Sequence, residues 1–504
     1  MNQRLQEAAR LYAARDHTAA EAVCRTIVAD DPRHFDALHL LGVLLSRQDQ
    51  HALALEYLRR AEAEQPGHRL LRINLGNALL ATQQFAAAAV VSGDADAASL
   101  NNLGLALRGM QRHEEAVAAF KAATELEPDY APAWFNLAGS LTKAGRLDAA
   151  LQAARTALRV APPDTPVHRL SDIVSEIGRI LMHLGQPEAA LRECRAFLVN
   201  HPGDRIVTWN MSLALLLLGR FAEGWAAYEQ RFGIPGHDPR PEGASVLDIA
   251  RVPGKRVLIL QEQGRGDMLH FVRYAPLLTD RGATVVVQAY PDLVPLLRAM
   301  PGIAEVVSTE APRPSADMIT PVMSLPLAFG TQPANIPYLR VPPEMSGRLD
   351  MRSDGRRRVG VAWSGSAHSY ERSAMSAETL APLFALPGFD FHCLQKDILE
   401  SDRAWLNSVR PALTLHTDRI GDFLDTAALI QTMDVVVTID TAVAHLAGSL
   451  ARPVHIMLPF NPDWRWLLNR SDSPWYPTAR LHRQPRPGPW APVVQSVIAV
   501  LTAP

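Results

Sequence analysis

A repeated spacing of small residues and proline runs through the first half of the chain. The pair Leu41-Gly42 is followed by Ala54, Ala61 and Pro66. Similar series begin at three further pairs, Leu103-Gly104, Leu137-Ala138 and Ile177-Gly178. Counting back from the pairs gives units that begin at Met1, Phe35, Arg69, Ala97, Ala131, Ser171 and Arg205, and most of the steps between them have the same length. This regularity predicts a stack of similar units over residues 1–233.

The spacing resembles that of the tetratricopeptide repeat, a pair of antiparallel helices with a period of about 34 residues. The resemblance implies an α-solenoid with a concave binding surface. Small residues such as Gly42 let neighbouring helices approach closely, and Pro66 ends the second helix of its unit. The third step is shorter than the others, so we expect the second helix of that unit to end early, near Gly93 and Asp94. The fifth step is longer because it contains the proline-rich segment APPDTPVHR.

Asparagines recur on the first helices of the units, at Asn74, Asn77, Asn101, Asn102 and Asn136. On a concave surface their amide groups can hydrogen-bond the backbone of an extended peptide, which makes the repeats a candidate site for a protein acceptor. The alternative is that asparagine is only tolerated on a solvated helix face. The final unit, GRFAEGWAAYEQRFGIPG, ends in aromatic residues and Arg231, which suits docking onto whatever follows it.

Charge and cysteine content exclude several classes of protein. The 504-residue chain has a formal net charge of −2 and a pI near 6.8, which offers no electrostatic basis for binding nucleic acid or an anionic membrane. Cys24, Cys194 and Cys393 lie far apart and form neither a paired framework nor a CxxC metal pattern, as in proteins of a reducing compartment. The first twenty residues lack an apolar core and no long apolar run follows, so we expect a soluble, cytoplasmic protein.

The second half alternates short apolar strands with helical segments. Residues 234–255 are rich in Gly and Pro and form a linker. Two α/β units follow, at 256–345 and 356–490, with a terminal helix over 491–504. The alternation predicts parallel sheets, so the fold class is an α-solenoid joined to a pair of Rossmann-type α/β domains. Ligands of open α/β sheets bind at the carboxyl ends of strands, which directs attention to the residues after RVLILQ, GVAWSG, HCLQ and VVTID.

The segment EQGRGD follows the first of these strands. Gly264 and Gly266 allow the backbone to turn tightly and to approach a ligand. Asp267 opens the next helix, where it is either a cap of the first-turn amides or a catalytic carboxylate. The sequence contains neither a GxGxxG fingerprint nor a Walker lysine loop, HExxH or GxSxG, so a nicotinamide enzyme, for example, has no support.

Together, EQGRGD, WSG with His368 and Arg372, LQKD, and DTAVAHLAG followed by LPFNPDWRW resemble one bacterial family over most of Arg256 to Gln484. That family combines tetratricopeptide repeats with a C-terminal glycosyltransferase family 9 (heptosyltransferase-like) domain. The resemblance implies a GT-B fold and inverting, metal-independent transfer of a sugar from a nucleotide diphosphate donor, with no other cofactor. It also implies that Asp267 is the base that takes the proton of the acceptor hydroxyl, with Glu262 in reserve.

The stretch VVVTIDTAVAHLAG is the candidate cradle for the donor diphosphate. A helix that follows a strand end offers free amides, here those of Thr441, Ala442 and Val443, and the small side chains leave room for phosphates. The alternative is a helix start whose small residues serve packing. We expect Asp440 to orient the loop or a sugar hydroxyl, and His445 to contact the donor or to pack in the core.

Other strand-end residues complete the predicted nucleotide-sugar site. Arg372 and Lys396 are candidates for pairing with the diphosphate, although a lysine at such a place is often only solvated. Gln395 is placed to contact the base or ribose. Gly365 permits close backbone approach, and Trp363 belongs either to the site or to the core. The aromatic residues after LPFNPD, namely Trp464, Trp466, Trp475 and Tyr476, are expected to shape the cleft wall, with carbohydrate stacking as the alternative.

These observations predict a glycosyltransferase whose repeats select a protein or glycan acceptor. The first α/β unit is compact for an acceptor-binding domain, so the repeats are expected to supply acceptor surface. A protein of another class remains possible on the same residues, namely a repeat scaffold whose α/β region binds nucleotide sugar weakly or has lost activity. A third reading is an enzyme of lipopolysaccharide precursors that uses the repeats only for assembly.

Overall fold

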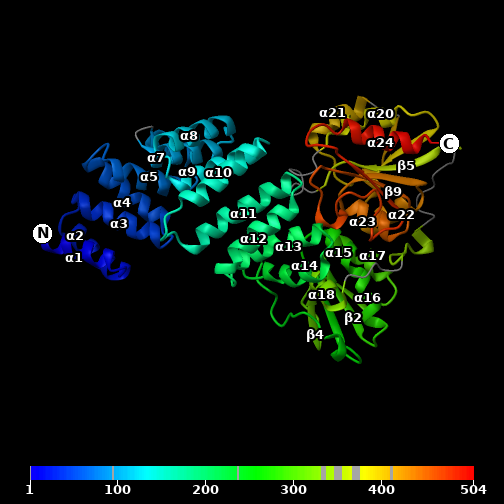
Figure 1. The fold of residues 1–504 in the computed structure, drawn as a ribbon. Coiled ribbons are helices and arrows are strands. Elements are labelled where there is room, and N and C mark those ends of the chain that lie inside the picture. The colour runs from blue at the N-terminus through cyan, green and yellow to red at the C-terminus, as the bar shows by residue number, and fades with distance from the viewer. Residues whose placement is uncertain are drawn as a thin grey trace. The chain divides into compact units, whose positions relative to one another are not determined.

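The structure is a computed structural model that describes residues 2–93, 96–234, 238–330, 336–345, 355–365, 375–408 and 412–503. It divides into two compact units, Met1–Leu184 and Gly185–Pro504, which are considered separately. Figure 1 shows the helix pairs of the first unit and the helices and sheets of the second. None of the described helices is both long and apolar enough to cross a membrane.

The first unit is a solenoid of paired helices. The first helices of the successive repeats are α1, α3, α5, α7, α9 and α11, with bounds Asn2–Ala13, Phe35–Arg47, Arg69–Ala81, Ala97–Gly109, Ala131–Lys143 and Val167–His183. The second helices are α2, α4, α6, α8 and α10, with bounds His17–Asp30, His51–Glu64, Phe85–Ser92, His113–Leu126 and Leu147–Val160. Their facing sides bury mainly alanine and leucine, as small residues at helix contacts require.

One backbone feature repeats in the first five helix pairs of this unit. The turn between the two helices contains one residue with positive φ, at Arg15, Asp49, Gln83, Gln111 and Gly145. Each lies at the same offset from its predicted unit start, so the register of the repeat is carried by the backbone even where glycine is absent. The second helix of the third pair has only 8 residues, and Gly93 with φ 60° turns the chain out of it.

The last helices of the repeat pattern belong to the second compact unit. These are α12 (Pro187–Asn200), α13 (Arg205–Leu217), α14 (Phe221–Tyr228) and the 3₁₀ turn η1 (Glu229–Arg231). The sequence pattern places the end of the repeats at residue 233, whereas the division between compact units falls after Leu184. The reason is packing, because α13 and α14 contact elements that follow the linker.

Two parallel sheets follow. The first has the order β3-β2-β1-β4, built from β1 (Arg256–Leu260), β2 (Thr284–Ala289), β3 (Glu305–Ser308) and β4 (Met318–Pro321). The second has the order β10-β9-β8-β5-β6-β7, built from β5 (Arg357–Ala362), β6 (Phe389–Cys393), β7 (Leu413–Leu415), β8 (Val435–Ile439), β9 (Val454–Leu458) and β10 (Ala479–Arg483). The predicted sequence of a helical solenoid and then parallel sheets is confirmed.

The strand orders define two topological switch points. In the first sheet the order reverses between β1 and β4, and in the second it reverses between β5 and β8. Crevices for ligands open at the carboxyl ends of strands at such points. The helices that begin there are α15 (Arg265–Phe271) after β1 and α23 (Ala442–Ser449) after β8. The last helix, α24 (Ala491–Leu501), packs on β9 and β10.

Candidate active site

The helices α15 and α23 pack against each other. Gly266 makes this contact possible, because a Cβ atom there would lie 3.1 Å from Cδ2 of His445 and 3.6 Å from Cα of Ala442. The two strand-end loops singled out in the sequence are therefore neighbours. They come from different sheets, so the site lies where the two sheets meet.

Asp267 is the third residue of α15 and has two partners. Its Oδ2 accepts a hydrogen bond of 2.8 Å from the backbone N–H of Gly264, so it does cap the helix start. Its Oδ1 forms an ion pair with the guanidinium of Arg465. Burial raises the pKa of Asp267, and the charge of Arg465 opposes that rise. The carboxylate is thus partly buried and lies beside one neutralising partner.

Arg465 is the residue of this site that the sequence analysis did not select. It lies in the turn η10 (Trp464–Trp466) after β9 and is 7% exposed. Its Nη1 binds Oδ1 of Asp463 at 2.8 Å, and its guanidinium lies 4.1 Å from the ring centre of Trp464. Its Nε is buried and has no hydrogen-bond partner among the described residues. The only sequence signal was an arginine between two tryptophans shortly after a strand end.

Asp440 directly follows the end of β8 (Val435–Ile439). Burial, and next the negative charge of Asp463, raise the pKa of Asp440 to about 7. Asp267 and Asp463 form ion pairs with Arg465, whose positive charge also acts on Asp440. Three carboxylates beside one cation favour retention of a proton near neutral pH, which is a property of acid–base centres.

The first turn of α23 offers backbone donors. Within the described part of the chain, the N–H groups of Thr441, Ala442 and Val443 donate to no protein acceptor. The Thr441 side chain does not cap the helix, and its hydroxyl lies 3.2 Å from that of Thr438. All three residues are partly exposed, so a ligand can reach them. The arrangement fits an anion, because free amides at a helix start attract negative charge.

His445 has a packing role in this structure. Its Nδ1 lies 2.9 Å from the hydroxyl of Tyr476, which His270 of α15 also contacts at 2.9 Å. The imidazole of His445 stacks on Trp466 with ring centres 5.4 Å apart. Burial lowers the pKa of both histidines well below the ordinary range, so both rings are neutral. Of the two roles expected for His445, these contacts fit packing in the core.

Gln395 and Trp363 hold the turn after β5 in place. Oε1 of Gln395 accepts from the backbone N–H of Trp363 at 2.6 Å and from that of Ser364 at 3.0 Å. The Trp363 indole is fully buried and donates to Asp402 at 2.9 Å. The amide oxygen of Gln395 is thus engaged with the protein, and Trp363 is a core residue. Gly365 follows this turn, beside the second switch point.

Of the two cationic residues predicted near the diphosphate, the structure describes Lys396 and not Arg372. Lys396 is exposed, and its Nζ donates to the carbonyl of Gly421 at 2.6 Å. This hydrogen bond lies at the surface of the protein. Arg372 lies outside the described residues, as do His368 and Ser373.

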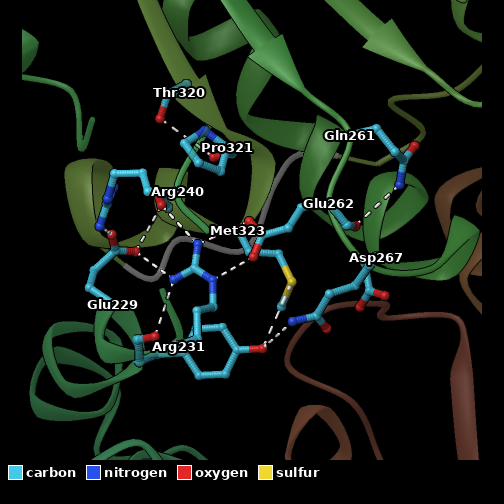
Figure 2. A network of polar contacts seen from close by, with 12 residues as sticks. Glu229, Arg231, Arg240, Gln261, Glu262, Asp267, Thr320, Pro321 and Met323 are labelled. Atoms are coloured by element: carbon cyan, nitrogen blue, oxygen red, sulfur yellow. Dashed lines mark hydrogen bonds and ion pairs between the residues drawn. The ribbon is translucent and has the colours of Figure 1, made fainter. Parts of the chain in front are cut away.

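Glu262, the reserve base, is held by an arginine. Arg231 binds both of its carboxylate oxygens, at 2.5 and 2.9 Å, in the two-pronged arrangement that Figure 2 shows. Both carboxylate oxygens of Glu262 are thus engaged by one guanidinium, as in a bidentate arginine–carboxylate pair. The geometry favours a structural role for Glu262, whereas Asp267, Asp440 and Asp463 are the carboxylates around Arg465.

The asparagines of the solenoid bond mainly to one another. Nδ2 of Asn102 donates to Oδ1 of Asn77 at 2.9 Å, and Nδ2 of Asn136 donates to Oδ1 of Asn101 at 2.8 Å. Asn74 lies 2.8 Å from Nε2 of His39. These bonds link the first helices of successive units. Asn74 and Asn77 also line a cavity of about 550 Å³ between α1, α3 and α5, so they remain candidates for contact with an acceptor.

Comparisons with known proteins agree with the helical part. The tetratricopeptide repeat family matches residues 5–69, 101–165 and 176–233. These stretches carry tetratricopeptide repeats, and the predicted repeat is confirmed. Protein FlbA of Caulobacter vibrioides is 26% identical over 533 residues, which cover 96% of this chain and 87% of FlbA.

Several solved structures have some likeness to part of the chain. PilW, a type IV pilus biogenesis factor, is 20% identical with a TM-score of 0.37, over 41% of this chain and 96% of PilW. Pseudomonas aeruginosa PilF is 17% identical with a TM-score of 0.34, over 41% of this chain and 94% of PilF. The match to the hetero-tetramer Cut9–Hcn1 of the APC/C is 19% identical with a TM-score of 0.36 and covers 42% of each chain, less than half of that chain.

Proposed function

We propose that this chain is a glycosyltransferase that moves a sugar from a nucleotide diphosphate donor to a protein or glycan acceptor selected by its tetratricopeptide repeats. On this proposal the two sheets are the halves of a GT-B-type transferase, with the nucleotide sugar on the second sheet. The observation that carries the proposal is the first turn of α23. Its three free amides lie beside the Asp267–Arg465 pair, at the switch point of the second sheet.

The site residues divide the chemistry as follows. An acceptor hydroxyl attacks the anomeric carbon, and its proton passes to a carboxylate oxygen of Asp267. The bond from the anomeric carbon to the phosphate oxygen breaks, and the nucleoside diphosphate leaves with the electron pair. The amides of Thr441, Ala442 and Val443 stabilise that developing charge. Attack opposite the leaving group inverts the anomeric centre.

Arg465 links donor binding to the base. In the free protein its guanidinium neutralises Asp267. A diphosphate at the start of α23 competes for the same guanidinium, because phosphate oxygens accept charge-assisted hydrogen bonds from arginine as carboxylate oxygens do. Asp267 then regains its basicity only when the donor is in place. On this proposal Asp267 stays paired with Arg465 until the donor binds, and only then accepts a proton.

One observation favours a second function, that of a repeat scaffold without transfer activity. Both candidate bases, Asp267 and Glu262, are occupied by arginines in the structure. A scaffold needs these pairs only for stability. The two functions differ in turnover, since a scaffold releases no nucleoside diphosphate from any donor.

A thermal-shift screen tests the donor site first. The full chain is heated with UDP, GDP and ADP and with UDP-glucose, UDP-N-acetylglucosamine, GDP-mannose and ADP-heptose. A ligand at one hundred times its dissociation constant stabilises the folded protein by about 2.7 kcal/mol. Release of nucleoside diphosphate from the stabilising donor then tests turnover. Absence of any shift contradicts the donor site, and a shift without turnover favours the scaffold.

A further inference from the structure

The end of the last repeat covers the switch point of the first sheet. Arg231, in the turn η1 that follows α14, reaches the residues that closely follow β1 and β4. Figure 2 shows its guanidinium between Glu229 and Glu262. In open parallel sheets this crevice is where ligands bind. Here the protein fills it with one of its own side chains.

Arg231 is buried, at 3% exposure, and its donors are well used. It binds Glu262 with two nitrogens, donates to the hydroxyl of Ser324 at 2.9 Å and binds Glu229 at 2.7 Å. Ser324 in turn donates to Glu229 at 2.8 Å. The loops after β1 and β4 are therefore fixed to each other through the last repeat.

Tyr228 holds the next residue of the same loop. Nε2 of Gln263 donates to the Tyr228 hydroxyl at 2.8 Å, and that hydroxyl lies 3.9 Å from the sulfur of Met323. Gln263 has a φ of 55°, a conformation that a non-glycine residue keeps only when its surroundings enforce it. Gly264 follows, and its N–H binds Asp267. Three consecutive residues thus connect the repeat to the proposed base.

The same helix contacts the other half of the ion pair. Trp225 of α14 packs edge-on against Phe271 of α15, with ring centres 5.6 Å apart, and against Trp464 at 5.1 Å. Trp464 directly precedes Arg465, and the Arg465 guanidinium lies over both rings. One face of the last repeat therefore supports both segments that carry the Asp267–Arg465 pair.

We propose that Tyr228 and Arg231 are positioning residues of the transfer site, so that the last tetratricopeptide repeat is part of the catalytic centre as well as of the acceptor-selecting array. The inference rests on the proposed function. It explains why the first α/β unit is compact, because the repeat supplies the support that the crevice of the first sheet would otherwise need. It also gives an acceptor bound to the last repeat a direct structural path to the base.

The test uses full-length Tyr228→Phe and Arg231→Lys, with Arg240→Lys as the matched control. Arg240 binds the same Glu229 at 2.7 Å but does not contact Glu262, and its side chain is 33% exposed. The readout is nucleoside diphosphate release from the donor chosen among UDP-glucose, UDP-N-acetylglucosamine, GDP-mannose and ADP-heptose. The maximal rate, the KM for the donor and the pH profile are measured for each protein.

A shift of the base by about 1 Å lowers the rate by about 100-fold, so we expect that loss in kcat for Arg231→Lys. Tyr228→Phe removes one hydrogen bond, and we expect a loss of about 10-fold with the donor KM unchanged and the acidic limb of the pH profile displaced. Arg240→Lys should stay within about 2-fold of the wild type, because lysine keeps a positive charge beside Glu229 and Arg231 still binds that carboxylate.

Two different failures are distinguishable. A wild-type protein that releases no nucleoside diphosphate from any donor overturns the proposed function and this inference with it. An active wild type whose Tyr228→Phe and Arg231→Lys variants keep kcat and pH profile overturns the inference alone. If Arg231→Lys fails to fold, Tyr228→Phe decides, because it adds no charge and removes only the hydroxyl.

Discussion

Asp267 and Arg465 are 198 residues apart in the chain and form a partly buried ion pair between the two sheets. Asp267 enters from the loop after β1, and Arg465 enters from the turn after β9. Arg465 is also shared with Asp463. The pair directly links the part of the site proposed to hold the base and the part proposed to hold the donor.

Asp267→Asn should abolish most of the turnover while the donor still binds. The amide retains the shape of the carboxylate but takes no proton, and loss of a general base lowers kcat by about 100- to 10,000-fold. Nucleoside diphosphate release and donor-induced thermal shift are measured on the same protein. Asp463→Asn is the control, since it removes the other ion pair of Arg465 and should lower kcat less. Unchanged turnover in Asp267→Asn would show that another residue is the base.

Asp440 should give the protein a specific pH dependence of stability. Burial and Asp463 raise the pKa of Asp440 to about 7, against about 3.9 for an aspartate in an unfolded chain. Between these pH values the folded protein holds a proton that the unfolded chain has lost. The free energy of unfolding therefore falls as the pH rises from about 4 to about 7, by at most about 1.4 kcal/mol per pH unit for one proton.

Asp440→Asn should remove this slope. The free energy of unfolding of the variant minus that of the wild type should be larger at pH 8 than at pH 5. Urea unfolding across that pH range measures this difference. Asp472→Asn serves as the control, because Asp472 is exposed and Arg470 lowers its pKa. Parallel pH profiles of the wild type and Asp440→Asn would contradict the assigned titration.

The repeats could be read from the sequence because their signal is local. Small residues and prolines at fixed offsets predicted helix starts such as Phe35, Arg69 and Ala97, where the structure begins α3, α5 and α7. The start of α11 was placed at Ser171 and lies at Val167, because the extra proline-rich residues lengthen the helix at its beginning. Strand–helix alternation also marked the parallel sheets.

The pairing of the site could not be read in this way. Arg465 pairs with a carboxylate from the other sheet, and no local pattern announces a partner so far away in the chain. The partners of Glu262 and Gln395 could not be read from the sequence for the same reason. Their positions at strand ends were visible, but Arg231 and the turn at Trp363 use their polar atoms. Position in a fold predicts access to a site, whereas partners decide the role.

Gly266→Ala should separate α15 from α23. The added methyl group would lie 3.1 Å from Cδ2 of His445, which cannot move easily because it bonds to Tyr476 and stacks on Trp466. Overpacking of this kind costs about 1 to 3 kcal/mol, and the better helix propensity of alanine offsets roughly 1 kcal/mol of it.

We therefore expect a modestly lower melting temperature and a weaker thermal shift with the donor. Gly203→Ala is the control, because a methyl group there meets nothing within 4 Å. A variant with unchanged donor affinity and stability would mean that the two helices are free to move apart and that their close contact is not needed.

Asn102→Ala should loosen the solenoid between its third and fourth units. Asn102 is 4% exposed and donates to Oδ1 of Asn77 at 2.9 Å and to the carbonyl of Ile73 at 3.3 Å. The variant loses these two hydrogen bonds, and a typical hydrogen bond contributes about 0.5 to 1.5 kcal/mol to stability. Hydrogen–deuterium exchange should rise in α5 and α7 and stay unchanged in the sheets of the second compact unit.

Asn77→Ala should have a smaller effect, because Asn77 is exposed and Asn102 keeps its bond to Ile73. Equal protection in the wild type and Asn102→Ala would show that the asparagine bonds do not stabilise the array, and would return these side chains to the role of acceptor contacts.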